Sequence, residues 1–455
     1  MGHRILTQSL RQIARKMADS SLQARELFEA TFVQHQPSLN AYIAYIPHLA
    51  RKQADAADAA GVRLGGLQGV PVSFKDLYGV AGLPTYAGTP RALPKVWTQE
   101  GAMVQSLRHQ LGVIVGKTHT VEFAFGGLGT SRHHTVPWNP ADRMTHRAPG
   151  GSSSGAGVSV VEGTALVAFG TDTGGSVRIP ASLTGCVGLK TTLGRWSTSG
   201  IVPLSPSFDT PGILTRSADD AAFAFEQLDA ARVPDLDPTT PLRIGVAEPF
   251  FWQNTDPGIS ERVHETLALV EAAGAKLTDQ TLPGCAEVYR IYHQGGIVSA
   301  ELYAFLRQSL PDWLETLDPR VRRRIDDGRA LEAWEYLHRK ARYADLAAKA
   351  AQTLSGYDAI ICPTVPIAPP PVALLDDPDT YASLNLAMLR NTCVVSFLGL
   401  CAVTIPAGLD AQGLPVGLQL IGAPYGEARQ LAIARHIETI LAKADVWHPL
   451  YNAKR

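Results

Sequence analysis

The chain has 455 residues, of which 45% are hydrophobic and 18% are charged. This composition can fill a large core and excludes a disordered or coiled-coil protein. Lys plus Arg total 41 and Asp plus Glu total 42, so the net charge of −1 gives no electrostatic sign of a nucleic acid or anionic lipid partner.

The five cysteines are widely spaced and form no C-x-x-C pair, which argues against a disulfide framework and a zinc site. The N-terminal residues lack the apolar run of a signal peptide, and no stretch approaches the roughly 18 apolar residues of a membrane span. We therefore expect a soluble, cytoplasmic protein without a bound metal.

The first 60 residues predict mainly helices. Ser20 and Gln23 have the spacing of a capping box, and the residues that follow would share one helix face: Ala24, Leu27, Phe28, Thr31 and Phe32. From about Gly65, short apolar runs at residues 70–74, 113–116 and 165–170 alternate with glycine-rich turns and helical stretches. Runs without polar alternation predict strands buried on both faces, hence an α/β fold with a mixed or parallel sheet covered by helices.

The second half of the chain begins after a polar, proline-rich segment, residues 231–241, which predicts a surface connection. A strand-like run follows at residues 242–247. Residues 430–442 predict an amphipathic helix with Ile433, Ala434, Ile437, Ile440 and Leu441 on one stripe. The chain has no internal repeat and no long linker, so its length alone does not divide it into domains.

Three short patterns resemble functional motifs but do not meet their requirements. The run LGVIVGKTH leaves three residues between Gly112 and Gly116, one fewer than a phosphate-binding loop needs. The GxSxG pattern centred on Ser153 needs a buried strand before it, and residues 143–149 are polar. His133 and His134 are adjacent and lack the spacing of metal ligands, which favours loop residues.

Residues 150–190 form the densest part of the sequence, with two serine-glycine clusters around one apolar segment. On the residues alone, two tight turns flanking a buried helix and strand explain this pattern as well as a catalytic site does. Upstream, Lys75 ends the apolar run 70–74. Burial would lower its pKa and make it a proton acceptor, whereas a lysine that reaches solvent is the simpler interpretation.

Taken together, these motifs resemble the amidase signature family of Ser-cisSer-Lys hydrolases. The resemblance rests on residues 150–190 and on Val72-Ser73-Phe74-Lys75-Asp76, and it extends through residues 112–123, 138–140, 358–364 and 413–422. It implies a single amidase domain over residues 1–455, with a large twisted mixed sheet covered by helices on both faces. The signature core would span about 65–215, and about 242–455 would supply the pocket and covering helices.

The resemblance also implies roles for individual residues. Ser176 would be the nucleophile, Ser152 the bridging serine on a cis Gly151–Ser152 peptide bond, and Lys75 the general base. Consecutive backbone amides of Thr173, Gly174, Gly175 and Ser176 would form the oxyanion hole. The family often has Gly-Gly-Ser-Ser-Gly-Gly at the first cluster. Ser154 and Ala156 depart from that pattern here, which affects only the expected shape of the loop.

Asp172 and Arg178 are close enough in sequence to pair and brace the serine loop. Phe125, Gly126 and Gly127 lie where the family lines its acyl pocket, although a core phenylalanine and a turn would explain them equally well. Residues 250–252 or 366–371 could form an apolar entrance.

The expected function is hydrolysis of a C–N bond in a small-molecule amide, anilide, carbamate or urea through an acyl-serine, with no cofactor. The sequence is compatible with a homodimer but does not determine the oligomeric state. One alternative is the glutamine-hydrolysing A subunit of a tRNA-dependent amidotransferase. That class usually carries a Gly-Thr-Tyr-x-Leu-Ser type signature, which residues 322–331 lack. Another alternative is a non-catalytic binding protein, against which the joint presence of Lys75, Ser152 and Ser176 argues.

Overall fold

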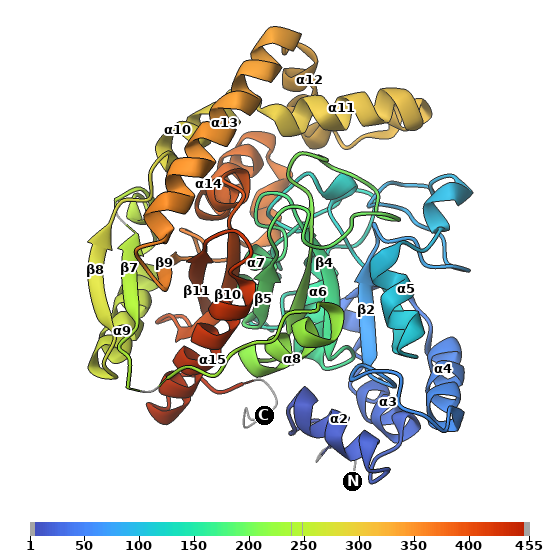
Figure 1. Cartoon of the computed structure of the whole chain (residues 1–455). Coiled ribbons are helices and arrows are strands. Elements are labelled where there is room, and N and C mark those ends of the chain that lie inside the picture. The colour runs from blue at the N-terminus through green and yellow to red at the C-terminus, as the bar shows by residue number, and fades with distance from the viewer. Residues whose placement is uncertain (1–4, 238, 248, 450–455) are drawn as a thin grey trace.

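A single twisted sheet runs through the whole molecule (Figure 1). The computed structural model describes residues 5–237, 239–247 and 249–449. Within these residues the sheet has 11 strands in the order β1-β3-β2-β4-β6-β5-β10-β11-β9-β7-β8. The strands are β1 (Tyr42–Tyr45), β2 (Pro71–Lys75), β3 (Val113–Thr118), β4 (Val167–Asp172), β5 (Val187–Lys190), β6 (Thr210–Thr215), β7 (Arg243–Ala247), β8 (Lys276–Gln280), β9 (Ala359–Pro363), β10 (Cys401–Leu409) and β11 (Pro415–Gly422).

The sheet is mixed, as the fold class predicted. β2 is parallel to β3 and β4, and β7 is parallel to β8 and β9, whereas the central pairs around β6, β5, β10 and β11 are antiparallel. The antiparallel β5–β10 pair joins the two expected parts of the chain in one sheet. The assignment of one domain to the whole chain stays a prediction.

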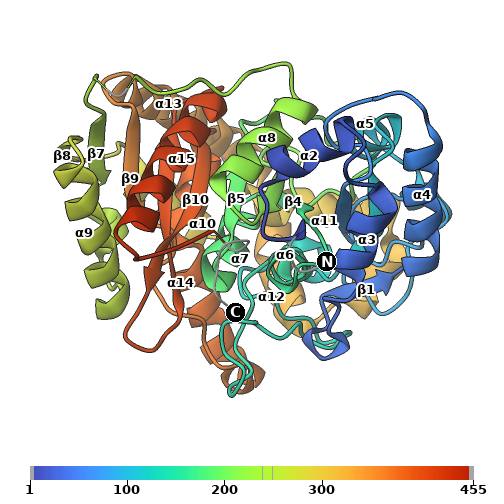
Figure 2. The same cartoon turned by 90° about the horizontal axis from the view of Figure 1, so that it is seen from below.

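Helices cover both faces of the sheet, which completes the predicted α/β architecture. α8 and α15 lie along one face and α6, α7 and α14 along the other (Figure 2). The helices are α2 (Leu10–Ala18), α3 (Ala24–Phe32), α4 (Pro47–Ala59), α5 (Ala102–His109), α6 (Ser154–Glu162), α7 (Arg178–Thr184), α8 (Ala218–Leu228), α9 (Pro257–Ala272), α10 (Cys285–His293), α11 (Ile297–Ser309), α12 (Pro319–Arg329), α13 (Ala333–Leu354), α14 (Pro378–Phe397) and α15 (Glu427–Lys443). α10 to α13 gather at one end of the sheet, at the top of Figure 1.

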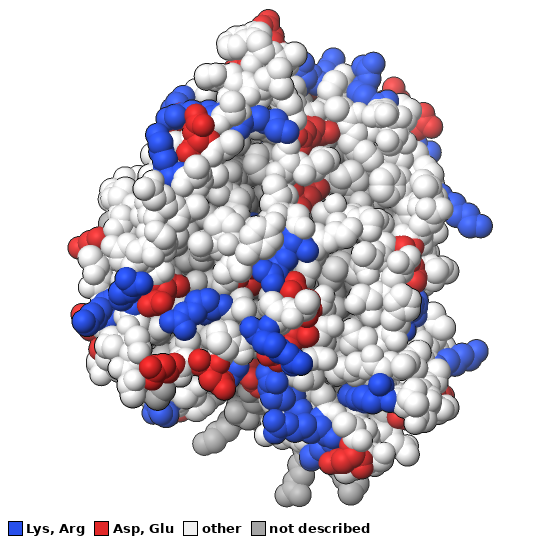
Figure 3. Space-filling model, viewed as in Figure 1, with Lys and Arg blue, Asp and Glu red and all other residues white. Residues whose placement is uncertain are grey.

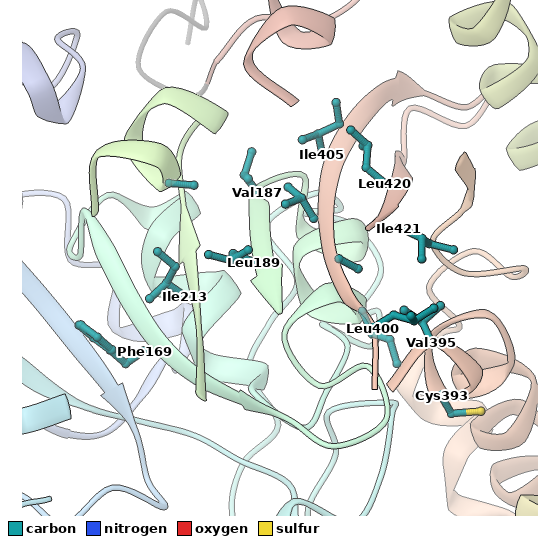
Figure 4. Close-up of a cluster of buried hydrophobic side chains, with 14 of the residues drawn as sticks. Phe169, Val187, Leu189, Ile213, Cys393, Val395, Leu400, Ile405, Leu420 and Ile421 are labelled. Carbon is teal, nitrogen blue, oxygen red and sulfur yellow. The ribbon is translucent and has the colours of Figure 1, made fainter. Parts of the chain in front are cut away.

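The centre of the core lies between the antiparallel strands and α14 (Figure 4). Leu189 of β5, Ile213 of β6 and Leu420 of β11 come from the central antiparallel strands, and Val395 comes from α14. All four side chains are fully buried. Removing this apolar surface from water stabilises the sheet on which the site is built.

In the N-terminal part, one local prediction is wrong and one strand was not predicted. α3 begins at Ala24, and its capping box joins Gln23 to Glu26, whose side chain accepts a hydrogen bond from Gln23 N at 3.1 Å. Ser20 instead has a positive φ of 62°, which is incompatible with the extended backbone of an N-cap, so the predicted Ser20–Gln23 box is wrong. The short edge strand β1 was also missed, because its four residues carry too little pattern to predict a strand.

The predicted strands at residues 70–74, 113–116 and 165–170 are confirmed as β2, β3 and β4, with shifted ends, and every residue of these strands is buried. β3 continues through Lys117, whose Nζ lies 2.7 Å from Asp76 Oδ1 in a buried ion pair. The glycine-lysine run is therefore part of a strand and not a phosphate-binding loop.

The surface agrees with the near-neutral composition. Positive and negative side chains are interspersed over the face drawn in Figure 3. All five cysteines are buried and free. No helix in the described part of the chain is both long and apolar enough to cross a membrane.

Candidate active site

Lys75 is the last residue of β2, at the centre of the parallel half of the sheet. Its side chain is completely buried. Its Nζ lies 2.7 Å from Ser152 Oγ and 2.7 Å from Thr171 Oγ1 on the adjacent strand β4. The strand thus carries the amine into the interior and holds it against two hydroxyl groups, and the interpretation of Lys75 as a side chain that reaches solvent is wrong.

Burial lowers the pKa of Lys75 to about 7, because the ammonium form loses its hydration there. The negative charges of Asp209 and Asp172 partly oppose this shift. At neutral pH a substantial fraction of Lys75 is therefore the free amine, which can accept a proton.

Ser152 is presented to Lys75 by the glycine-serine loop before α6. The Gly151–Ser152 peptide bond is cis, as the family resemblance implied. Gly151 N donates to Gly127 O at 2.8 Å, and Val121 N donates to Ser152 O at 3.2 Å, so the loop is pinned to the segment after β3. A side chain on Gly151 would meet the backbone of Gly129, which explains why glycine stands there.

Ser176 lies in the turn between β4 and α7 and lines a small cavity. Its carbonyl oxygen accepts a hydrogen bond from Ser153 N at 3.2 Å, which fixes the two serine loops against each other. Among the described residues no hydrogen bond joins the Oγ atoms of Ser152 and Ser176. Such bonds often form only when substrate is bound.

Ser153 does not reach this cavity. It is fully buried, and its Oγ donates to Thr171 O at 3.3 Å. No strand precedes it in residues 143–149, so the structure does not support a nucleophile elbow there.

The turn that carries Ser176 is braced by a buried ion pair, as expected from the sequence. Arg178 Nη2 lies 2.8 Å from Asp172 Oδ1, and Arg178 Nε lies 3.0 Å from Asp172 Oδ2. Burial alone would raise the pKa of Asp172, but the Arg178 guanidinium holds it well below its usual range. Asp172 also accepts hydrogen bonds from Gly175 N at 2.8 Å and Val177 N at 3.2 Å.

This ion pair affects which of the four expected oxyanion donors are free to bind a substrate. The amide of Gly175 already donates to Asp172, so it is not open to a substrate in this conformation. Within the described chain, the amides of Thr173, Gly174 and Ser176 make no hydrogen bond. These three amides are the donors that the turn leaves unoccupied.

Asp209 is a further polar residue of the site that no sequence pattern singled out. It precedes β6, accepts from Thr173 Oγ1 at 2.5 Å, and accepts from Leu204 N and Ser205 N at 2.9 Å each. Burial raises its pKa to about 6. Its hydrogen bond to Thr173 supports the serine turn, and the pairing of β6 with β4 brings it there.

The cavity beside Ser176 draws on both halves of the chain. Its lining residues are Ala124, Phe125, Gly126, Thr173, Gly174, Ser176, Leu204, Tyr292, Val298, Arg324, Leu389 and Phe397. Two of the three expected pocket residues, Phe125 and Gly126, line this cavity. Gly127 is not, and its amide donates instead to Asn385 Oδ1 at 2.7 Å. Residues 250–252 and 366–371 do not line this cavity either.

The histidine pair lies in a loop, as predicted. His133 Nε2 lies 3.2 Å from Glu122 Oε1, and His134 Nε2 lies 2.9 Å from Thr89 O. In the described ranges, no three His, Cys, Asp or Glu side chains are grouped closely enough to hold a metal ion.

Comparison with known proteins places this geometry in a family. The profile of the Amidase family matches residues 26–431. The chain is 46% identical to a Comamonas testosteroni protein named 2-amino-5-chloromuconic acid deaminase, over 98% of each chain. It is 32% identical to a Pseudomonas putida amidase over 89% of this chain and 90% of that one. It is also 32% identical to the A subunit of the glutamyl-tRNA(Gln) amidotransferase from Geobacter sp. (strain M21), over 90% and 91%.

Solved structures agree with the sequence comparison. A crystal structure of an amidase superposes with a TM-score of 0.85 at 29% identity, covering 97% of this chain and all of the other. The protein is therefore a member of the amidase family, a hydrolase that acts on amide or related C–N bonds.

Proposed function

We propose that the protein hydrolyses its C–N bond through a covalent intermediate on Ser176, with Ser152 as the bridging serine and Lys75 as the general base. The observation that carries this proposal is the buried Lys75 amine, 2.7 Å from Ser152 Oγ, with its pKa lowered to about 7. A serine hydroxyl is a poor nucleophile until a base takes its proton. The free amine of Lys75 is such a base.

During one turnover, a proton first passes from Ser176 towards Lys75 and later returns from Lys75 to the leaving group. As Ser176 Oγ attacks the substrate carbonyl, its proton passes to Ser152 Oγ while the Ser152 proton passes to Lys75 Nζ. When the tetrahedral intermediate collapses, the same route returns a proton to the leaving amine, and the C–N bond breaks. Water then attacks the acyl-serine, again with Lys75 as base, and releases the acid.

The oxyanion of the tetrahedral intermediate would be held by the free amides of Thr173, Gly174 and Ser176. Removing one such donor typically costs about 10²–10³ in rate. Gly175 contributes differently: its amide fixes Asp172, which keeps the turn in shape.

For the substrate, the relative at 46% identity supports a small molecule from which an amino group is released as ammonia. We propose 2-amino-5-chloromuconic acid and related small carboxylic acids as the first compounds to test. In the chloromuconic acid the amino group is on C2 and not on a carbonyl, so no acyl-serine forms. Ser176 Oγ would instead add to C2 of the imine tautomer, ammonia would leave, and water would release the 2-oxo acid from Ser176. The glutamine-hydrolysing role in an amidotransferase stays the second candidate, because proteins with that name are similar over most of this chain. Residues 322–331, most of which lie in α12, however lack the signature that this class usually carries.

The test uses mass spectrometry to measure the ammonia or amine that the purified protein releases from a panel of 2-amino-5-chloromuconic acid, glutamine, aliphatic amides, anilides, carbamates and ureas. With an amide substrate, added hydroxylamine should divert the acyl-serine to a hydroxamate. Ser176→Ala should abolish both products, whereas the matched control Ser153→Ala should retain them. Loss of turnover in Ser153→Ala, with activity kept in Ser176→Ala, would contradict the assignment. Turnover of glutamine alone would favour the amidotransferase role.

A further inference from the structure

A second and larger cavity adjoins the one beside Ser176. It has a volume of about 500 Å³, and its lining includes Arg132, Arg320 and Arg323. Tyr292 of α10 and Arg324 of α12 line both cavities. A substrate too long for the cavity beside Ser176, called the serine cavity below, would therefore extend past these two side chains into the larger cavity.

Arg324 is held rigidly at this junction. Its Nη1 donates to Phe125 O at 2.7 Å, and its Nη2 donates to Tyr292 Oη at 2.8 Å. Its guanidinium carbon lies 3.7 Å from the centre of the Phe125 ring. A guanidinium has five N–H donors, so these two bonds leave donors for a further acceptor.

The charge of Arg324 is not balanced by a neighbouring acid. Arg320 pairs with Asp318 and Arg323 pairs with Asp379. In the part of the chain that the structure describes, no carboxylate lies within ion-pair distance of Arg324. Asp327 and Asp376 line the larger cavity but do not reach it.

From this arrangement we propose that Arg324 binds a substrate carboxylate that is not itself attacked, and that the larger cavity receives the rest of the substrate chain. The substrate would thus be a small linear acid with its scissile C–N bond at Ser176. This inference rests on the proposed function and deepens it. A half-buried, pre-positioned guanidinium is the side chain best suited to a carboxylate, because its planar fork can bind both oxygens.

The chemistry of the relative's substrate agrees with this assignment. A muconic acid is a six-carbon diacid, so a compound of that type brings a second carboxylate beyond the reacting carbon. The uncharged residues of the serine cavity, such as Leu204, Val298 and Phe397, offer that carboxylate no partner. Arg324 is the cationic residue in that lining.

The kinetic test compares two six-carbon amides that differ only in the group at the far end of the chain. Adipamic acid carries a terminal carboxylate, and hexanamide is its neutral counterpart. Arg324→Gln should raise KM for adipamic acid, and for 2-amino-5-chloromuconic acid, by about 10- to 100-fold, the usual range for a hydrogen-bonded charge. KM for hexanamide should change less than about threefold. Arg329→Gln, on the exposed side of the same helix, is the matched control.

A binding test does not depend on turnover. Calorimetry would measure the affinity of muconic acid for Ser176→Ala and for Ser176→Ala combined with Arg324→Gln. The inference predicts that the second substitution weakens binding by the same 10- to 100-fold, and that Arg324→Lys weakens it less. If no member of the panel is hydrolysed but this difference is found, the proposed function fails and the carboxylate site stands.

Three results would overturn the inference. One is an equal effect of Arg324→Gln on adipamic acid and hexanamide, which would mean that Arg324 only supports Phe125 and Tyr292. Another is an unchanged affinity for muconic acid in the double variant. The third is failure of muconic acid to bind Ser176→Ala at all.

Discussion

The buried pair of Asp172 and Arg178 offers a sharp test of how the serine turn is held. Asp172→Asn preserves the shape of the side chain but removes its charge. The fully buried Arg178 guanidinium would then lose its carboxylate partner and keep only neutral acceptors, which are Gln419 Oε1 and Ser396 Oγ, each at 2.6 Å, and the amide oxygen of the new side chain. Removing one partner of a buried ion pair typically costs about 3–5 kcal/mol, because the other charge is left uncompensated.

We therefore expect Asp172→Asn to lower the free energy of unfolding by about 3–5 kcal/mol at pH 7. The pKa of Asp172 is depressed in the folded state, so its stabilising effect is present above the usual aspartate pKa and is lost only as the pH falls through the much lower folded value. The deficit of the variant should accordingly persist from pH 5 to pH 8, and it should be larger at pH 5 than at pH 8, because Asp172 also raises the pKa of Lys75, which loses its proton near pH 7. Activity should also fall, because Gly175 N and Val177 N lose a charged acceptor.

Urea denaturation of the wild type and Asp172→Asn measures this difference. Asp379→Asn is the matched control, since it breaks the exposed pair with Arg323 and should leave the midpoint unchanged. A loss of less than about 1 kcal/mol in Asp172→Asn, together with full activity, would refute the role of the pair as a brace.

Two further predictions concern other buried positions. Gly175 has a φ of 131°, and a Cβ there would overlap the Thr392 hydroxyl, so Gly175→Ala should lower both the melting temperature and kcat. Unchanged values for both would contradict the tight packing of the turn. Glu438 accepts hydrogen bonds from Ala218 N, and burial raises its pKa to about 8. A raised carboxylate pKa makes stability fall as the pH rises from about 4.5 to about 8. Glu438→Gln should therefore gain stability relative to the wild type over that range, as measured by melting temperature at several pH values. A constant difference would contradict the shift.

The strands of the site could be predicted from the sequence because short, continuous segments determine them. An unbroken apolar run such as the one before Lys75 predicts a strand buried on both faces, and β2 is buried at every residue. The resemblance to the family rests on motifs of the same kind, short segments in which Ser152 and Ser176 stand at fixed positions. Their placement near the buried Lys75 follows from the pairing of β2 with β4.

The far wall of the pocket could not be predicted in the same way. Tyr292 and Arg324 lie on α10 and α12, which reach Ser176 only when the helices at one end of the sheet fold over it. On the sequence, Arg324 is one of three consecutive arginines, and nothing there distinguishes it from its ion-paired neighbour Arg323. Which arginine lacks an acidic partner is decided by long-range packing and cannot be predicted from the local sequence.

The central claim is that the free amine of Lys75 takes the proton from the serine pair. The most direct measurement is the pH dependence of kcat/KM for the wild type, Lys75→Ala and Asp209→Asn. Because the base must be deprotonated, the wild-type value should rise with pH and level off above an apparent pKa near 7.

Asp209→Asn removes a charge that raises the pKa of Lys75, so its rising limb should move to lower pH. Lys75→Ala should lose about 10²–10⁴ in rate at pH 7 and recover in part at high pH. A flat wild-type profile between pH 5 and 9, or near-normal activity of Lys75→Ala at pH 7, would contradict the account.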